Sequence, residues 1–263
     1  MSSDNIILKR DGKVAVVTLN RPEKLNAVNL EMMRKLIEVF GELARDDSVA
    51  VMVLTGAGRA FSSGLDMGQM AAIAGLEGPA LDAEQIRQVF HTTPRVISLL
   101  LEDMQKPTIA MVNGVAIAVS CDLTLACDMR TGSPNARFMQ TQVTLGLIPG
   151  GGGTWILPRL VGYGKAMEMI LTGDPVDGQE AYRLGILDEL YPEDKLEEKT
   201  MELAQKIAGK PATALRLAKL NVRRGLTMDL ESALALVAAS EGLAAASSDY
   251  RQAFGEVWKR RTR

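Results

Sequence analysis

Two short stretches of this sequence contain the residue types from which an anion-binding site is built. In each, small residues follow an apolar run and precede an expected helix, at residues 63–66 (Ser-Gly-Leu-Asp) and 113–119 (Asn-Gly-Val-Ala-Ile-Ala-Val). The N–H groups at the start of a helix lack intrahelical acceptors and carry partial positive charge. Two such helix starts that face each other are able to bind an oxyanion. Strand–loop–helix units are common, however, and most of them bind nothing.

Two polar residues follow these stretches and differ in what they can do chemically. Asp122 lies in the expected helix, and a carboxylate both accepts and donates a proton. Gln142 has no titratable proton, so it only forms hydrogen bonds. The residues alone also allow Asp122 to be a helix residue satisfied by a nearby donor, and Gln142 to be a packing or surface residue.

The elements that position these residues follow from the apolar pattern. β-rich runs predict strands at residues 6–10, 13–20, 49–55 and 107–112. Helical spacing predicts a helix capped by Asn29 and running to about residue 45, and further helices at 83–103, at 116–126 and almost without interruption from 163 onward. Strands that alternate with helices predict an α/β fold, followed by an all-helical part after about residue 196.

Composition limits the class of protein. The chain of 263 residues is 47% hydrophobic and 24% charged, which is ordinary for a soluble globular protein. Its net charge of −2 argues against nucleic acid or a membrane surface as a partner. No apolar segment is long enough to span a bilayer, and the first residues lack a secretory signal, so we expect a cytoplasmic location. Cys121 and Cys127, the only cysteines, are expected to be reduced core thiols.

The segments Ala60-Phe61-Ser62-Ser63-Gly64-Leu65-Asp66 and Lys106 to Trp155 resemble the crotonase (enoyl-CoA hydratase/isomerase) family, and the resemblance covers nearly the whole chain. It implies a crotonase-like spiral of ββα turns with an acyl-CoA site over residues 1–195. It also implies a helical C-terminal oligomerisation region at residues 196–263. The assembly expected from the resemblance is a homotrimer or a dimer of trimers, a homohexamer.

The resemblance also assigns roles to individual positions. The backbone amides of Leu65 and Val119 are expected to form the oxyanion hole. Coenzyme A enters as part of the substrate, so neither a separate cofactor nor a metal is expected. The residues expected to contact coenzyme A are Leu25, Ala27, Ser63, Gly64, Asp66 and Met67, with Phe254 and Lys259 reaching the nucleotide of a neighbouring subunit.

The sequence departs from the family at the positions that carry the chemistry. The two catalytic glutamates of the hydratase pattern fall on Asp122 and Gln142, and a glycine falls on Val119. The N–H of Val119 stays available if its φ is negative, while its isopropyl group narrows the cavity. We expect reversible hydration of a 2-enoyl-CoA, with Asp122 as acid/base and Gln142 orienting the water. The alternatives are double-bond isomerisation through Asp122 alone, and acyl-CoA binding with little turnover.

Overall fold

The larger of two sheets contains six strands in the order β1-β2-β3-β4-β6-β9. The computed structural model describes residues 5–77 and 81–261. β1 and β2 form an antiparallel hairpin, and each later pair of neighbours runs parallel. The first four strands confirm the predicted ones, whereas β6 and β9 were not predicted because such short strands leave no clear pattern. The strands are β1 (Ile6–Asp11), β2 (Val14–Leu19), β3 (Val51–Gly56), β4 (Thr108–Val112), β6 (Met129–Gly132) and β9 (Glu189–Leu190).

A second, smaller sheet contains β5 (Val115–Ile117), β7 (Arg137–Met139) and β8 (Val176–Asp177). Isolated bridges between Val28 and Leu65 and between Ser62 and Ala116 join the neighbouring loops to this layer. The chain therefore repeats one order of elements: a strand of the large sheet, a short strand or bridge, and then a helix. This arrangement confirms the predicted α/β spiral of ββα turns.

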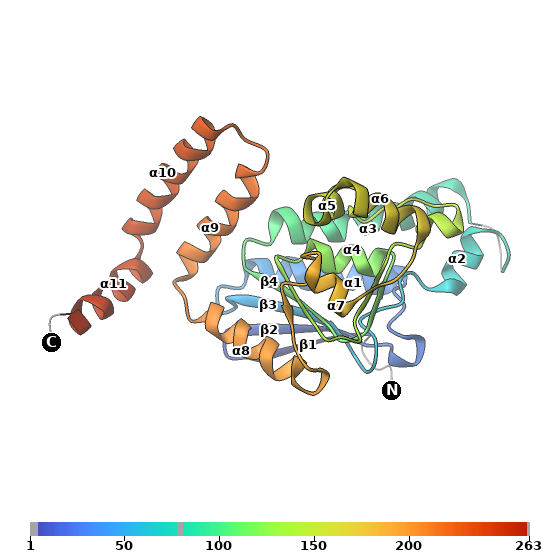
Figure 1. Ribbon diagram of the computed structural model, residues 1–263, viewed down its shortest axis with the longest axis horizontal. Coiled ribbons are helices and arrows are strands. Elements are labelled where there is room, and N and C mark those ends of the chain that lie inside the picture. Colours follow the sequence, from blue (N-terminus) through green and yellow to red (C-terminus); the bar gives the residue numbers. More distant parts are fainter. Residues whose placement is uncertain (1–4, 78–80, 262–263) are drawn as a thin grey trace.

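Helices cover the large sheet on the side shown above the strands in Figure 1. The predicted cap of α1 is confirmed, because the Asn29 side chain accepts a hydrogen bond from the Met32 N–H. α3 continues past Pro94 into a π-helical segment at Leu99–Asp103. The helices are α1 (Leu30–Arg45), α2 (Met67–Ile73), α3 (Ala83–Ser98), α4 (Val119–Ala126), α5 (Gly153–Val161), α6 (Tyr163–Thr172) and α7 (Gly178–Arg183).

One predicted boundary needs correction. The helix expected from residue 116 begins only at Val119, because residues 115–117 pair with β7 as strand β5. Pairing with a distant strand decides this boundary, and local apolar spacing does not record such pairing. Gln142, for which no element was predicted, begins a single 3₁₀ turn at Gln142–Leu145.

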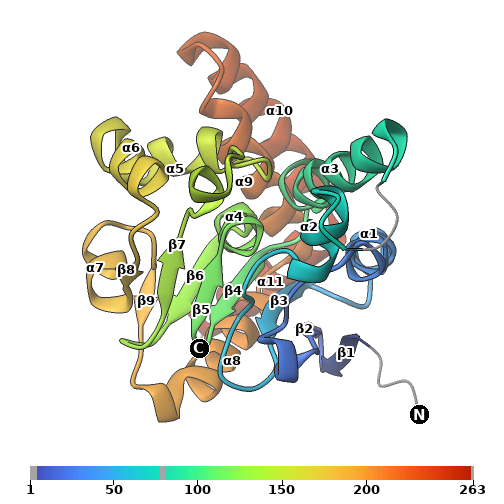
Figure 2. The same cartoon turned by 90° about the vertical axis from the view of Figure 1, so that its right-hand side faces the viewer.

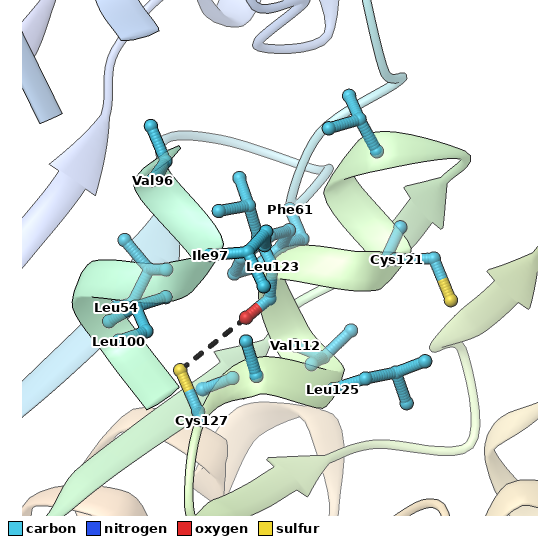
Figure 3. Close-up of a cluster of buried hydrophobic side chains, with 14 of the residues drawn as sticks. Leu54, Phe61, Val96, Ile97, Leu100, Val112, Cys121, Leu123, Leu125 and Cys127 are labelled. Carbon is cyan, nitrogen blue, oxygen red and sulfur yellow. Dashed lines mark hydrogen bonds between the residues drawn. The ribbon is translucent and has the colours of Figure 1, made fainter. Parts of the chain in front are cut away.

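The main core lies between the sheet and helices α1, α3 and α4, and Figure 3 shows part of it. Phe61 and Leu100 are fully buried there. Cys121 and Cys127 are buried and unpaired, and their sulfurs point apart in Figure 3. The Cys127 thiol donates to the Leu123 carbonyl oxygen at 3.6 Å. The interpretation of both cysteines as core thiols is confirmed.

Helix α8 (Leu196–Ala208) covers the opposite face of the sheet (Figure 1). Its Leu196, Ala204 and Ala208 pack in one cluster with Val51 and Val53. Residues of α8 up to Ala208 therefore pack on the sheet, while the division expected at residue 195 stays a prediction. Residues 1–4, 78–80 and 262–263 of the two predicted regions lie outside the described residues.

Three further helices form an arm that projects from the core (Figure 1). They are α9 (Ala212–Gly225), α10 (Leu230–Ala246) and α11 (Ser248–Arg261). Figure 2, turned by 90°, shows α9 and α10 behind the helices that cover the large sheet. Within the described residues no single helix is long and apolar enough to cross a membrane. Only the bent pair α10 and α11, which turn by 73°, reaches that length and composition together.

The arm is fixed to the core by a partly buried ion cluster around Asp128. The Asp128 carboxylate lies 2.6 Å from Lys219 Nζ and 2.6 Å from Arg223 Nη2, both on α9. It also accepts hydrogen bonds from the N–H and hydroxyl of Thr108 in β4. The Lys219 side chain is 8% exposed, and it donates to the Lys106 carbonyl oxygen. One carboxylate thus joins the sheet to the base of the arm.

We predict that Asp128→Asn lowers the free energy of unfolding by roughly 3 kcal/mol. Removing one partner of a buried ion pair leaves the other charge uncompensated, and partial exposure of Asp128 puts the effect at the low end of the usual range. Urea denaturation measures the change. Glu84→Gln, which breaks the exposed pair with Arg87, is the control and should change stability little. Equal stability of the two variants would contradict the role given to Asp128.

Candidate active site

A cavity of about 250 Å³ lies where the two predicted loops meet. Its wall is mainly aliphatic, and none of the described residues that line it is charged. An apolar cavity with a few polar groups is typical of a small-molecule site. The lining residues are Ser63, Leu65, Met67, Met70, Phe90, Thr93, Ile117, Ala118, Val119, Thr141, Gln142, Leu145, Leu147, Ile148, Gly150 and Gly151.

The amide of Leu65 is turned away from its neighbouring strand. In the parallel bridge to Val28, the residues flanking Leu65 form the hydrogen bonds: Val28 N–H donates to the Gly64 carbonyl oxygen, and Asp66 N–H donates to the Val28 carbonyl oxygen. Backbone groups alternate in direction along an extended chain, so the Leu65 N–H points to the other side. Within residues 5–77 and 81–261 this N–H has no acceptor.

Val119 is the first residue of α4 and presents the second free amide. Its φ is negative, which is the condition for keeping the N–H available, whereas Ala118 before it has φ 52° and ψ −120°. Ala118 N–H donates to the Met139 carbonyl oxygen, but the Val119 N–H has no acceptor in the described part of the chain. The strained backbone at Ala118 thus turns the chain from β5 into α4 and leaves the next amide free.

The two loops that carry these amides contact each other. A Cβ placed on Gly64 would lie 3.0 Å from the Ile117 carbonyl oxygen, so only glycine fits comfortably there. The buried Ser120 hydroxyl donates to the Ser62 hydroxyl at 2.6 Å, and Ser62 in turn donates to the Asn26 carbonyl oxygen at 2.7 Å. This hydrogen-bonded serine pair fixes the distance between the two loops. Sequence reasoning did not identify it.

Asp122 lies behind the cavity wall rather than on it. Its side chain is fully buried, and one carboxylate oxygen accepts the Gly151 N–H at 3.0 Å. The other accepts from Gln140 Nε2 at 2.8 Å. A Cβ on Gly151 or Gly153 would lie 2.6 or 2.3 Å from a carboxylate oxygen, so the glycine run gives the carboxylate its space. Burial raises the pKa of Asp122 to about 7, against the lowering effect of the Gln140 and glycine N–H bonds.

Two glutamines complete the polar part of the site. Gln142 lines the cavity and is 7% exposed, yet neither its side-chain oxygen nor its nitrogen has a hydrogen-bond partner in the part of the chain that the structure describes. A buried amide without partners costs free energy unless a ligand or water completes its hydrogen bonds. Gln140, which the sequence did not single out, holds Asp122 and has a free oxygen of its own. No group of metal-ligating side chains occurs among the described residues.

The structure brings together only part of the expected coenzyme A contacts. Ser63 and Met67 line the cavity, and Gly64 is next to them. Leu25 has φ 48° and adjoins this loop, because its carbonyl oxygen accepts the Ser63 N–H. Ala27 is buried, and its carbonyl oxygen accepts from Arg21, which also binds the Asp66 carboxylate at 2.9 Å.

Phe254 and Lys259 lie elsewhere in the molecule. Both are on α11, at the opposite end of the chain's long dimension from α2 (Figure 1). Phe254 stacks between Tyr250 and Trp258, and its side chain is half exposed. Within one chain these two residues therefore do not reach the cavity.

Known proteins resemble this chain in sequence and in fold. The family model described as enoyl-CoA hydratase/isomerase matches residues 9–255. A short-chain-enoyl-CoA hydratase of Clostridium acetobutylicum is 37% identical over 96% of this chain and 94% of its own length. A crotonyl-CoA hydratase of Syntrophomonas wolfei is 33% identical over the same shares. The crystal structure of an enoyl-CoA hydratase from Bacillus anthracis superposes with a TM-score of 0.91, at 31% identity, over 98% of this chain and 97% of that one.

We predict that Asp122→Asn becomes more stable relative to the unchanged protein as pH rises. The unfolded carboxyl group loses its proton near pH 4, and the folded one near pH 7. Between these values the folded state binds the additional proton, so stability falls as pH rises and levels off above 7. Asparagine does not titrate, and Gln140 can turn its free oxygen toward the new amide. The difference should approach about 4 kcal/mol above pH 7.

Urea denaturation between pH 4 and pH 8 measures this difference. Asp174→Asn, at an exposed position, is the control and should follow the unchanged protein at every pH. Parallel profiles for Asp122→Asn and the unchanged protein would contradict a raised pKa for Asp122.

Proposed function

This chain belongs to the enoyl-CoA hydratase/isomerase family, and we propose that it catalyses reversible hydration of a short 2-enoyl-CoA. The support from relatives is consistent: the hydratases named above match it over nearly their full length. Coenzyme A enters as part of the substrate, so the proposed reaction needs no separate cofactor. We place the reaction in the cytoplasm.

One observation carries the proposal, and it concerns three residues that line a single apolar cavity. Within the described residues, the backbone N–H groups of Leu65 and Val119 have no acceptor and the side-chain amide of Gln142 has no partner. The N–H groups of Leu65 and Val119 are donors for a thioester oxygen. They stabilise the negative charge that develops there when the double bond takes up water, and they do so most strongly where bulk water is excluded. Backbone donors keep this ability whatever side chain they carry.

The proton steps are assigned to Asp122 and the water to Gln142. In hydration, the water oxygen bonds to C3 of the enoyl group, one water proton passes to Asp122, and a proton passes from Asp122 to C2. An acid with a pKa of about 7 is suited to both transfers near neutral pH. Gln142 cannot transfer a proton, but its free oxygen and nitrogen are able to hold the attacking water.

The position of Asp122 also favours a second candidate function, which is acyl-CoA binding with little turnover. Both carboxylate oxygens are occupied, and Gly151 stands between the carboxylate and the cavity. A site of this kind binds and polarises an acyl-CoA, but proton transfer is slow unless the Gly150–Gly153 run moves. Double-bond isomerisation by Asp122 alone also requires that the carboxylate reaches the cavity. Hydration and isomerisation therefore both depend on movement of the Gly150–Gly153 run.

The arm is proposed to join subunits as a trimer or a dimer of trimers. Aliphatic and aromatic side chains remain exposed on α10 and α11, which is unusual for the surface of a monomer. In such an assembly Phe254 and Lys259 of one chain would reach the nucleotide of coenzyme A bound to another. The exposed residues are Leu230, Leu234, Val237, Leu243, Tyr250, Phe254, Val257 and Trp258.

Hydration of crotonyl-CoA, followed by loss of ultraviolet absorbance of the conjugated thioester, tests the proposed reaction. We predict that Asp122→Asn lowers the rate by about 10²–10⁴-fold, the usual contribution of a general acid/base. The combined change Asp122→Glu and Gln142→Glu should raise the rate, and by more than the two single effects predict, because both groups act on one water.

Binding of acetoacetyl-CoA by titration calorimetry is the control for these variants. Affinity should barely change, because the donors to the thioester oxygen are backbone groups. Full turnover by Asp122→Asn would show that the proton travels through another group. Absence of hydration by the unchanged protein, with acetoacetyl-CoA still bound, would favour the second candidate function.

For the assembly, light scattering should give three or six times the chain mass of 28.4 kDa. Leu234→Arg combined with Leu243→Arg places two charges on exposed apolar positions of α10 and should shift the mass toward one chain. Leu76→Arg, exposed outside the arm, is the matched control and should not. A monomer at micromolar concentration before any change would refute the proposed assembly.

A further inference from the structure

Both free amides belong to residues that line the same cavity and carry branched aliphatic side chains. Leu65 and Val119 are in its wall, and Val119 is 5% exposed. An oxygen that accepts an N–H lies about 2.9 Å from the nitrogen, and the acyl α-carbon is two bonds further on. The α-carbon of a bound acyl group therefore lies within about 5 Å of the Val119 nitrogen. That separation is short enough for a Val119 methyl group to contact a substituent on the α-carbon.

A second side chain narrows the same end of the cavity. Ala118 has φ 52° and ψ −120°, a conformation that favours glycine, and yet it carries a methyl group. That methyl faces the opposite loop, because a Cβ placed on Gly64 would lie 3.6 Å from it. The loops are fixed to each other by the hydrogen bond between Ser120 and Ser62. The two loops that form the wall beside these amides are therefore unable to move apart easily.

We propose that Val119 makes this site selective for acyl groups whose α-carbon is unbranched. The inference rests on the proposed function, because it takes the acyl oxygen to lie on the two amides. A methyl branch at the α-carbon adds volume next to a β-branched side chain with few rotamers. Close-packed walls tolerate an added methyl group poorly.

Butyryl-CoA and 2-methylpropanoyl-CoA test this directly, because they are isomers that differ only in the branch. Titration calorimetry with the full chain should give at least about tenfold tighter binding of butyryl-CoA. Val119→Ala should reduce this ratio to about threefold or less, whereas Val119→Thr, which keeps the branched shape, should retain it. The ratio is compared within each variant, so a general loss of affinity does not affect it.

Equal affinity of the unchanged protein for the two isomers would overturn the inference, as would a ratio that Val119→Ala leaves unaltered. Binding of neither isomer would overturn both the inference and the proposed site. A second measurement separates the remaining cases: turnover of crotonyl-CoA and of 2-methylcrotonyl-CoA. If the isomers are distinguished in binding but crotonyl-CoA is not hydrated, selectivity stands and the proposed reaction fails.

Discussion

The proposed site depends on two backbone N–H groups, those of Leu65 and Val119, that must stay free of acceptors within the protein. Such groups are costly in a folded protein, since nearly every buried amide finds a partner. Here the neighbours of each amide are paired instead: Gly64 and Asp66 bond to Val28, and Ala118 bonds to Met139. The isolated bridge between Val28 and Leu65 supplies the first two bonds, and strand β7 of the small sheet supplies the third. These few residue pairs therefore matter more for the proposed function than their number suggests.

A second constraint is the close contact between Asp122 and the glycine run. The carboxylate holds the Gly150–Gly153 segment through the Gly151 N–H, and that segment forms one wall of the cavity. Burial raises the pKa of Asp122, while the donated hydrogen bonds oppose the rise. The same group is thus both a fixed structural contact of the cavity wall and an ionisable group directly behind that wall. In the proposed reaction, proton transfer and the position of the wall therefore depend on one side chain.

Sequence reasoning identified the features that depend on neighbours along the chain or on small residues. The four long strands, the Asn29 cap, the core cysteines and the two loops with Leu65 and Val119 were of this kind. It did not identify β5 to β9, whose short strands form only because a distant partner is present. It also missed Gln140, since no spacing distinguishes it. The burial of Asp122 behind Gly151 was equally invisible, because a sequence does not record which way a carboxylate points.

If the arm joins subunits as proposed, the stability of this protein depends on its concentration. In a single chain the apolar side chains of α10 and α11 named above remain exposed, and the base of the arm is tied to the core by the Asp128 cluster and by Arg223, which also donates to the Leu100 and Leu101 carbonyl oxygens. A partner that covers these side chains binds the folded chain and not the unfolded one. By mass action, the midpoint of unfolding then rises with protein concentration. For a chain built in this way, dilution acts in the same direction as a mild denaturant.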